Sequence, residues 1–212
     1  MPSSFNAFGS RGREIGGSNP VWLGVPTPVP VGGTLASGFA KKGIFIPAGT
    51  PVNLASKVIT PYLTYVLTAV AKESSTIVGV TIDPKAYGYV PQVGDYLFSV
   101  SKSNFASNGS PVAITAVAAN ATDASLLDVT IALTGVAVGD VVALAPSSTA
   151  LGTPNGYLWN DIYLGDLEDD LAASGAVIEH APDGILIDLT PAAEIKAAMK
   201  AAVPGVYQFT NA

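Results

Sequence analysis

Short apolar runs separated by turn-forming residues dominate this chain from about residue 41 to residue 146. The runs are rich in β-branched and aromatic residues, and Gly, Pro, Asn, Asp or Ser bounds each one, a pattern typical of β-strands. Strands are predicted over residues 61–71, 75–83, 95–101, 110–119, 125–135 and 140–146. So many short strands in one span predict a mainly β fold built as a sandwich or a barrel.

The stretch "IFIPAGTPVNL", residues 44–54, shows the same punctuation on a smaller scale. One apolar run ends at Pro47 and another resumes after Pro51. Proline fixes φ and glycine adopts φ values that other residues avoid, so the residues between the runs favour a turn. The chain is therefore predicted to leave a sheet, turn and re-enter it.

Three short motifs occur twice in the same order within the β region. "TAVA", "VTI" and "VGD" occupy residues 68–71, 80–82 and 93–95, and they recur at residues 115–118, 129–131 and 138–140. In both copies "VGD" precedes an apolar run, as expected of a turn that needs the flexibility of glycine. The repetition indicates two related β modules.

Residues 147–212 predict a small α+β part. An Asn155-Gly156 turn leads into an aromatic strand-like run, and the acidic residues that open the segment 165–175 favour a short helix. Residues 175–190 predict two strands around Pro182, Asp183 and Gly184.

A helix is predicted after residue 190. Thr190 can cap it, and Pro191 suits its first position because proline has no amide hydrogen to leave unpaired. One apolar face follows the spacing i, i+3, i+4, i+7 and i+8, and Pro204 and Gly205 end the pattern. We expect this face to serve oligomerisation or packing through Ile195, Ala198, Met199, Ala202 and Val203.

Residues 1–40 predict an extended arm. They contain eight glycines and five prolines, and the run "VPTPVPV" favours polyproline geometry. Such a segment builds no core of its own, yet Phe5, Phe8, Trp22 and Phe39 are spaced along it. Because ordering a chain is costly in entropy, we expect a partner surface to accept these rings, with a flexible tail as the alternative.

The composition predicts a globular chain with a nearly neutral surface. Hydrophobic residues make up 49%, enough for the core of one large or two modest domains, and only 12% of the residues are charged. A surface so poor in charge leaves apolar patches unless copies or partners cover it. We therefore expect a homo-oligomer, and a trimer rather than a dimer.

The distribution of charge disfavours nucleic acid as a partner. Residues 1–100 hold seven Lys or Arg and four Asp or Glu, whereas residues 101–212 hold three and twelve. Phosphate backbones are bound by clustered basic residues, and no such cluster occurs. The chain has no cysteine and shows neither a signal peptide nor a membrane span, so disulfides, Cys-based zinc sites and a membrane partner are not expected.

Catalytic motifs are not found. His180 is the one histidine, and without neighbours of matching chemistry it reads as a turn or edge residue. No Gly-x-Ser-x-Gly elbow or phosphate loop occurs. The acidic group Asp166, Glu168, Asp169 and Asp170 lacks the spacing of a calcium loop and suits a helix N-terminus. No enzyme activity, catalytic residue, metal or cofactor is therefore expected.

The segments "IPAGTPVNL", "VGDYLFSV" and "EHAPDGILIDLTPAAEIKAAMKAAVPGV" resemble the head fiber and capsid decoration proteins of tailed bacteriophages. The resemblance covers about residues 40–100 and 176–206. It implies a non-enzymatic structural protein on the outside of a capsid, usually a homo-oligomer, with the major capsid protein or other head proteins as partners and the virion as its location.

Under this resemblance the chain divides into three parts: a capsid-docking arm (1–40), a β domain (41–146) and a C-terminal α+β module (147–212). We expect Phe5, Phe8 and Trp22 to occupy pockets of the capsid, and Arg11 and Arg13 to meet acidic capsid residues. The alternative is an adhesin or carbohydrate-binding module of a virion that uses Tyr157, Trp159 and Tyr163.

Overall fold

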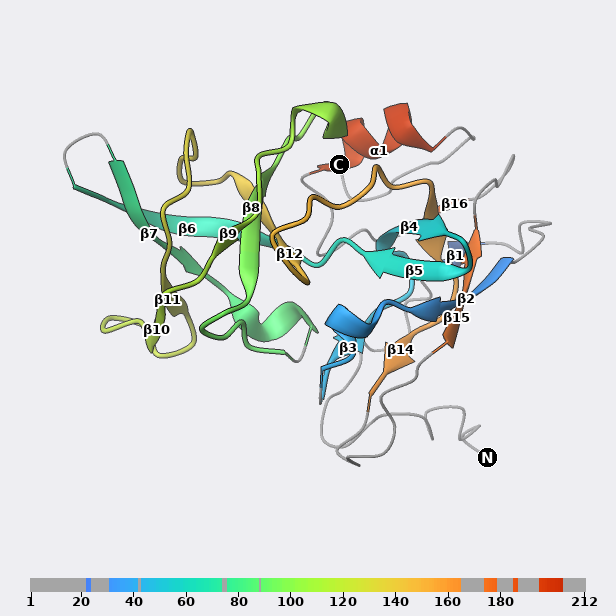
Figure 1. Ribbon diagram of the computed structural model, residues 1–212, viewed down its shortest axis with the longest axis horizontal. Coiled ribbons are helices and arrows are strands. Elements are labelled where there is room, and N and C mark those ends of the chain that lie inside the picture. The colour runs from blue at the N-terminus through green and yellow to red at the C-terminus, as the bar shows by residue number, and fades with distance from the viewer. Residues whose placement is uncertain are drawn as a thin grey trace.

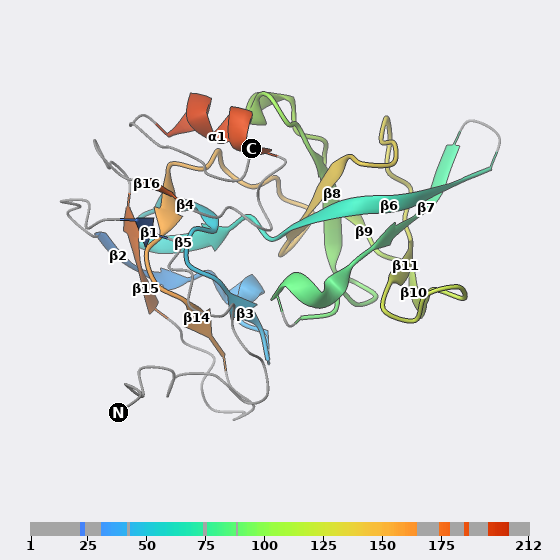
Figure 2. The same cartoon turned by 180° about the vertical axis from the view of Figure 1, so that it is seen from behind.

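A computed structural model of the protein describes residues 22–23, 31–41, 43–73, 76–87, 89–164, 174–178, 185–186 and 195–203. Across these residues the chain is mostly β-strand, with short 3-10 turns and one α-helix. The predicted mainly β class is therefore confirmed. Figure 1 shows two lobes, a curled sheet on one side and a small barrel on the other, and Figure 2 shows the same separation from behind.

A closed five-stranded barrel forms one lobe, and its strands come from distant parts of the chain. The order around the barrel is β13-β15-β2-β5-β4, in which β2 and β5 run parallel and the other neighbours run antiparallel. Their bounds are β2 Val31–Leu35, β4 Pro51–Ala55, β5 Val58–Pro61, β13 Gly156–Leu158 and β15 Ser174–Ile178. The barrel thus draws on all three predicted segments, and its hydrogen bonding crosses both predicted boundaries.

Residues 31–40, which the sequence analysis assigns to the arm, belong to this barrel lobe. After β2 the chain makes a 3-10 turn, Ser37–Phe39, in which Phe39 is fully buried in the chain's own core. Leu35 is also buried, and Ala36 donates its N–H to the carbonyl of Ile59 at 2.9 Å. A strand whose edge and side chains are satisfied within the chain has no need of a partner surface.

A seven-stranded antiparallel sheet forms the other lobe, in the order β10-β11-β7-β6-β12-β8-β9. The bounds are β6 Thr64–Glu73, β7 Thr76–Ile82, β8 Tyr96–Val100, β9 Val112–Ala113, β10 Ala116–Ala119, β11 Leu127–Thr130 and β12 Val141–Ala145. β9 and β10 stand at opposite ends of the order but adjoin in the chain, so the sheet curls back on itself. Each of the six strands predicted between residues 61 and 146 contributes to this lobe.

The repeated motifs occupy equivalent places in the curled sheet. "TAVA" lies in β6 in the first copy and runs into β10 in the second, and "VTI" lies in β7 and ends β11. Each pair forms a hairpin in which Val70 faces Val80 and Val117 faces Val129. The motif "VGD" then precedes β8 and β12. Two related β modules are therefore confirmed.

Two apolar clusters lie on the two sides of β8 and β12. The larger one fills the inside of the curled sheet and continues into the barrel lobe, and includes Leu97, Val142 and Leu144. The smaller one lies against the outer side, and includes Phe98, Val141 and Ala143. β12 is consequently buried along its whole length.

Two minor sheets complete the fold. β3, Phe45–Ile46, pairs with β14, Ile162–Tyr163, and β1, Trp22–Leu23, pairs with β16, Ile185–Leu186. The predicted turn after Ile46 is confirmed, because Thr50 donates its N–H to the carbonyl of Pro47 at 3.2 Å before β4 begins. The two strands predicted in 175–190 are found, but β15 pairs in the barrel and β16 pairs with β1.

The β4–β5 hairpin turns through Ser56 and Lys57, whose φ angles are +51° and +64°. Tight hairpin turns of this left-handed type favour Asn-Gly, because a Cβ atom is strained there. We expect the double substitution Ser56→Asn and Lys57→Gly to raise the free energy of unfolding by about 1 kcal/mol. Urea denaturation measures this change. Gly139→Ala, at φ +84°, should lower stability by a similar amount, and a less stable double variant would contradict the turn geometry.

Candidate functional site

The turn before β8 is organised by the carboxylate of Asp95. Gln92 donates its N–H to Oδ2 of Asp95 at 2.9 Å, and Asp95 donates its N–H to the carbonyl of Gln92 at 3.1 Å. Gly94 between them has a φ of +93°, which glycine adopts without a steric penalty. The motif "VGD" therefore encodes a turn that its own acid residue closes.

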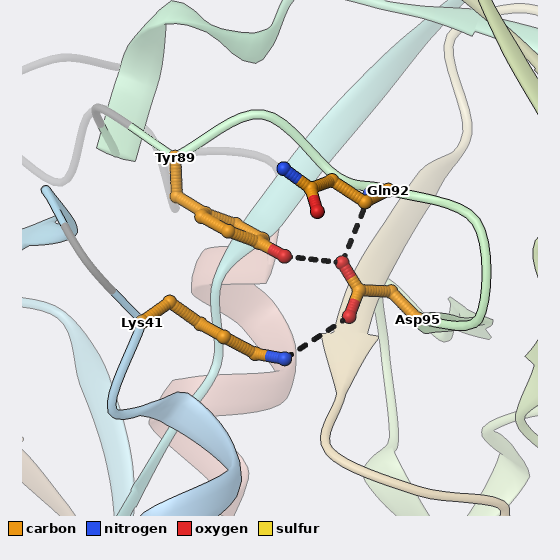
Figure 3. A network of polar contacts seen from close by, with 4 residues as sticks. All are labelled: Lys41, Tyr89, Gln92 and Asp95. Carbon is orange, nitrogen blue, oxygen red and sulfur yellow. Dashed lines mark hydrogen bonds and ion pairs between the residues drawn. The ribbon is translucent and has the colours of Figure 1, made fainter.

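Asp95 also connects the two lobes (Figure 3). The Tyr89 hydroxyl donates to Oδ2 at 2.6 Å, and Lys41, which follows the 3-10 turn of the barrel lobe, places Nζ 3.3 Å from Oδ1. The Lys41 ammonium also lies 5.9 Å from the centre of the Tyr89 ring. We call Lys41, Tyr89, Gln92 and Asp95 the Asp95 cluster. Charge-assisted bonds to a carboxylate that is only 12% exposed are stronger than surface ion pairs.

The second "VGD" turn repeats this geometry with a more solvated carboxylate. Ala137 donates its N–H to Oδ2 of Asp140 at 2.9 Å, and Asp140 donates its N–H to the carbonyl of Ala137 at 3.0 Å. Lys102 lies 3.5 Å from Oδ1 and donates to the carbonyl of Gly139. With side chains 46% and 40% exposed, this ion pair is screened by water and contributes little to stability.

The buried tyrosines near the Asp95 cluster are held in their neutral form. Burial, and then the hydrogen bond and charge of Asp95, raise the pKa of Tyr89 well above its ordinary value. Burial likewise raises the pKa of Tyr87, whose hydroxyl accepts the N–H of Thr64 at 2.9 Å, and of Tyr65, whose ring stands edge-on to that of Tyr87. The hydroxyls of Tyr87 and Tyr89 therefore act as hydrogen-bonding groups rather than as bases, whereas the Tyr65 hydroxyl is buried without a hydrogen-bond partner among the described residues.

Other carboxylates of the described residues also bond to the chain itself. Asp128 accepts from the Asn120 amide at 2.9 Å and from the Thr81 hydroxyl at 2.6 Å, and these bonds lower its pKa. Asp161 accepts the N–H of Ala48 at 2.7 Å, and Asp123 accepts the N–H of Ser125 at 2.9 Å. In the part of the chain that the structure describes, no group of three or more His, Cys, Asp or Glu could hold a metal ion.

The predicted docking residues fall mainly outside the described residues. Phe5, Phe8, Arg11 and Arg13 all lie there, as do His180 and the acidic group of residues 166–170. Trp22 is described in its backbone alone, which pairs with Leu186 in the sheet of β1 and β16. The docking hypothesis stays a prediction.

The predicted helix face lies in the chain's own core. The helix α1, Lys196–Ala202, begins after Ile195, and the predicted cap Thr190 lies outside the described residues. Ile195, Ala198, Met199 and Val203 are buried, and Ala202 is half-buried. They pack with Tyr62, Phe98 and Phe105 on the outer side of β8 and β12. Of the two predicted roles, packing within the chain accounts for this face.

The aromatic residues of the alternative adhesin hypothesis do not share one exposed surface. Tyr157 is fully buried in the cluster beneath α1, and Trp159 is half-buried against the same cluster. Tyr163 is 37% exposed in β14. Tyr157 is therefore a core residue and is not available to stack on a sugar.

Of the Asp95 cluster, the sequence pattern indicated Asp95 as a turn residue but none of its partners. The repeated "VGD" marked Asp95 and Asp140 as turn residues. Lys41 lies 54 positions from Asp95, so its approach depends on how the lobes meet. Tyr89, six positions before Asp95, was the nearer signal, because an aromatic hydroxyl next to a turn acid can bond to it.

No family model, curated protein or solved structure matches this chain. In the part of the chain that is described, no helix has the length and apolar character needed to cross a membrane.

The buried tyrosines predict a fall in stability at high pH. Their pKa is raised in the folded state above the ordinary 10.0, so the unfolded chain loses protons first once the pH exceeds about 10. The contribution of these tyrosines to the free energy of unfolding is therefore fully present below about pH 10. Above pH 10 the free energy of unfolding decreases by about 1.4 kcal/mol per pH unit for each such tyrosine. Urea denaturation between about pH 9 and about pH 11 measures the slope. Tyr89→Phe should make it shallower, and an unchanged slope would contradict the role of Tyr89.

The packing of α1 predicts the effect of truncating its most buried side chain. Met199→Ala should lower the free energy of unfolding by about 2–5 kcal/mol, because it opens a cavity among Tyr62, Phe98 and Phe105. Ala201→Ser, at an exposed position of the same helix, is the matched control and should change stability by less than about 0.5 kcal/mol. Equal effects of the two substitutions would show that α1 is not docked on β8 and β12.

Proposed function

We propose that this chain is a structural virion protein attached to the outside of a bacteriophage capsid, as a head fiber or decoration protein, and that it has no catalytic role. The observation that carries the proposal is that carboxylates at several turns and strands bond to donors of the chain itself. Both carboxylate oxygens of Asp95 bond to donors of the chain, and Asp140, Asp128 and Asp161 similarly hold turns or strands together. Polar groups engaged in this way support a role in shape and attachment.

Two of the three segments that resemble head proteins form the framework of the body. "IPAGTPVNL" supplies the turn after β3 and the barrel strand β4, and "VGDYLFSV" supplies the Asp95 turn and β8. The second segment lies at the junction of the lobes, because its Asp95 contacts Lys41, which precedes β3 and the first segment. The resemblance therefore concerns residues that define the shape of the body.

Attachment is proposed to use the residues that precede β1. Phe5 and Phe8 would occupy apolar pockets of the major capsid protein or another head protein, and Arg11 and Arg13 would meet acidic residues there. Aromatic and arginine side chains are the types that dominate binding energy at protein interfaces. A homo-oligomer on the capsid surface, with three subunits favoured, would cover the low-charge surface of the body.

Deletion of residues 2–20 tests this attachment, because it removes Phe5, Phe8, Arg11 and Arg13 and leaves β1, with Trp22, in place. Binding to emptied capsids by co-sedimentation should weaken at least about tenfold, and Phe5→Ala with Phe8→Ala should account for much of the loss. Lys57→Glu with Lys72→Glu, at exposed positions of the body, is the control for charge and should leave binding within about twofold.

Two results would overturn the proposal. The first is unchanged capsid binding by a truncated protein that has the thermal unfolding of the full chain. The second is failure of the full chain to bind capsids at all, especially if it binds glycans and loses that binding on Trp159→Ala.

A further inference from the structure

The curled sheet is a two-fold arrangement of two equivalent units within one chain. The first unit, residues 64–100, contains β6, β7 and β8, and the second unit, residues 112–145, contains β9 with β10, then β11 and β12. Equivalent strands of the two units pair as β7 with β11 and β8 with β12, and the units also meet where β6 pairs with β12 and β8 with β9. The inference concerns this meeting surface and does not rest on the proposed function.

The pair of β7 with β11 and the pair of β8 with β12 each have a register that is symmetric about its centre. Val80 and Val129, which are the first residues of the two "VTI" motifs, face each other across β7 and β11. Phe98 and Ala143, each three residues after the aspartate of its "VGD", face each other across β8 and β12. A contact in which equivalent residues face one another is the signature of a two-fold, self-complementary interface.

The remaining contacts between the units are reciprocal. Val66 of β6 faces Val141 of β12, and its equivalent Ala113 of β9 faces Tyr96 of β8. The turn contacts repeat this exchange. Leu67 donates its N–H to the carbonyl of Asp140 at 2.8 Å, and Ile114 donates its N–H to the carbonyl of Asp95 at 2.8 Å.

Side chains follow the same symmetry. The Thr68 hydroxyl donates to the carbonyl of Thr81 at 3.1 Å, and the Thr115 hydroxyl donates to the carbonyl of Thr130 at 3.1 Å. Val93 and Val138, at the tips of the two "VGD" turns, are 64% and 65% exposed. The equivalence therefore extends from backbone register to hydroxyl bonds and exposed turn positions.

We propose that each unit binds the other unit of a second copy of the chain through this meeting surface, as it binds the other unit of its own copy. Two chains can then exchange units and form a two-fold dimer with two complete curled sheets. The dimer with exchanged units contains the same strand pairs as the single chain. The difference in free energy between the two forms therefore depends on the connection between the units. A short connection gives an intrachain partner an effective concentration of about millimolar.

The connection, residues 101–111, allows β8 to fold back against β9. Gly109 donates its N–H to the carbonyl of Ser99 at 2.9 Å, and Phe105 is buried beside Tyr62. In the exchanged form β8 and β9 of one copy become one continuous strand, which runs antiparallel to the same strand of the second copy. The pairs of Tyr96 with Ala113 and of Leu97 with Val112 are then made between chains.

Removal of residues 101–111 from the full chain tests the proposal, since a chain without the connection cannot fold β8 back on β9. We expect a folded protein with twice as many chains per particle as the control, by light scattering and circular dichroism. In the control, glycine and serine replace the same residues at unchanged length, so it loses the same side chains, Phe105 and Lys102 included. A folded deletion variant with the assembly state of the control overturns the proposal.

A second measurement keeps the proposal testable if the deletion variant does not fold. Thr81 and Asp128 face each other across the two units, and the chain has no cysteine of its own. An isotope-labelled full chain with Thr81→Cys and an unlabelled full chain with Asp128→Cys are unfolded together, refolded at about millimolar concentration and oxidised. We expect a disulfide between position 81 of one chain and position 128 of the other by mass spectrometry. Its absence, while the same two substitutions in one chain do form the disulfide, overturns the proposal.

Discussion

The position of β12 is the constraint on which the structure depends. All five of its residues are buried, because the inner cluster of the curled sheet lies on one side and the cluster beneath α1 lies on the other. β12 also pairs with both β6 and β8, so it connects the first unit to the second. A strand buried on both faces requires apolar residues at every position, and "VVALA" provides them. Small Ala143 and Ala145 on the outer side leave room for the large rings of Tyr62 and Phe98.

The acid residues have a consistent role in this chain. Hairpins and strands of few residues need turns that close reliably, and a carboxylate that accepts the N–H three residues earlier closes such a turn without a long loop. Asp95 adds a connection to the barrel lobe through Lys41, whereas Asp140 bonds within its own lobe. The same motif is therefore structural in both units and joins the lobes in only one of them. This use of charged groups within the chain agrees with the structural role that we propose.

Much of the local structure was predictable from residue patterns, and most of the pairing was not. The strands between residues 61 and 146, the turn after Ile46 and the two "VGD" turns follow from alternation, proline and glycine over a few neighbouring positions. The assignment of residues 31–40 to an arm was different, because the glycines of β2 resemble a flexible segment until a neighbouring strand satisfies their backbone. Gly33 lies so close to Ile59 and Leu54 that a side chain would collide with them, and only the closed barrel reveals this need for glycine.

The sequence by itself determined which segments become strands, that two β units repeat, and that the last helix has one apolar face. These properties depend on neighbours within a few positions and on the periods of strand and helix. The tertiary structure alone decided that β13 and β15 close a barrel with β2, that α1 buries Met199 in the chain's own core, and that Lys41 reaches Asp95. Such contacts join positions far apart in the chain, and their free energy depends on which surfaces meet, a quantity that no short stretch of residues contains.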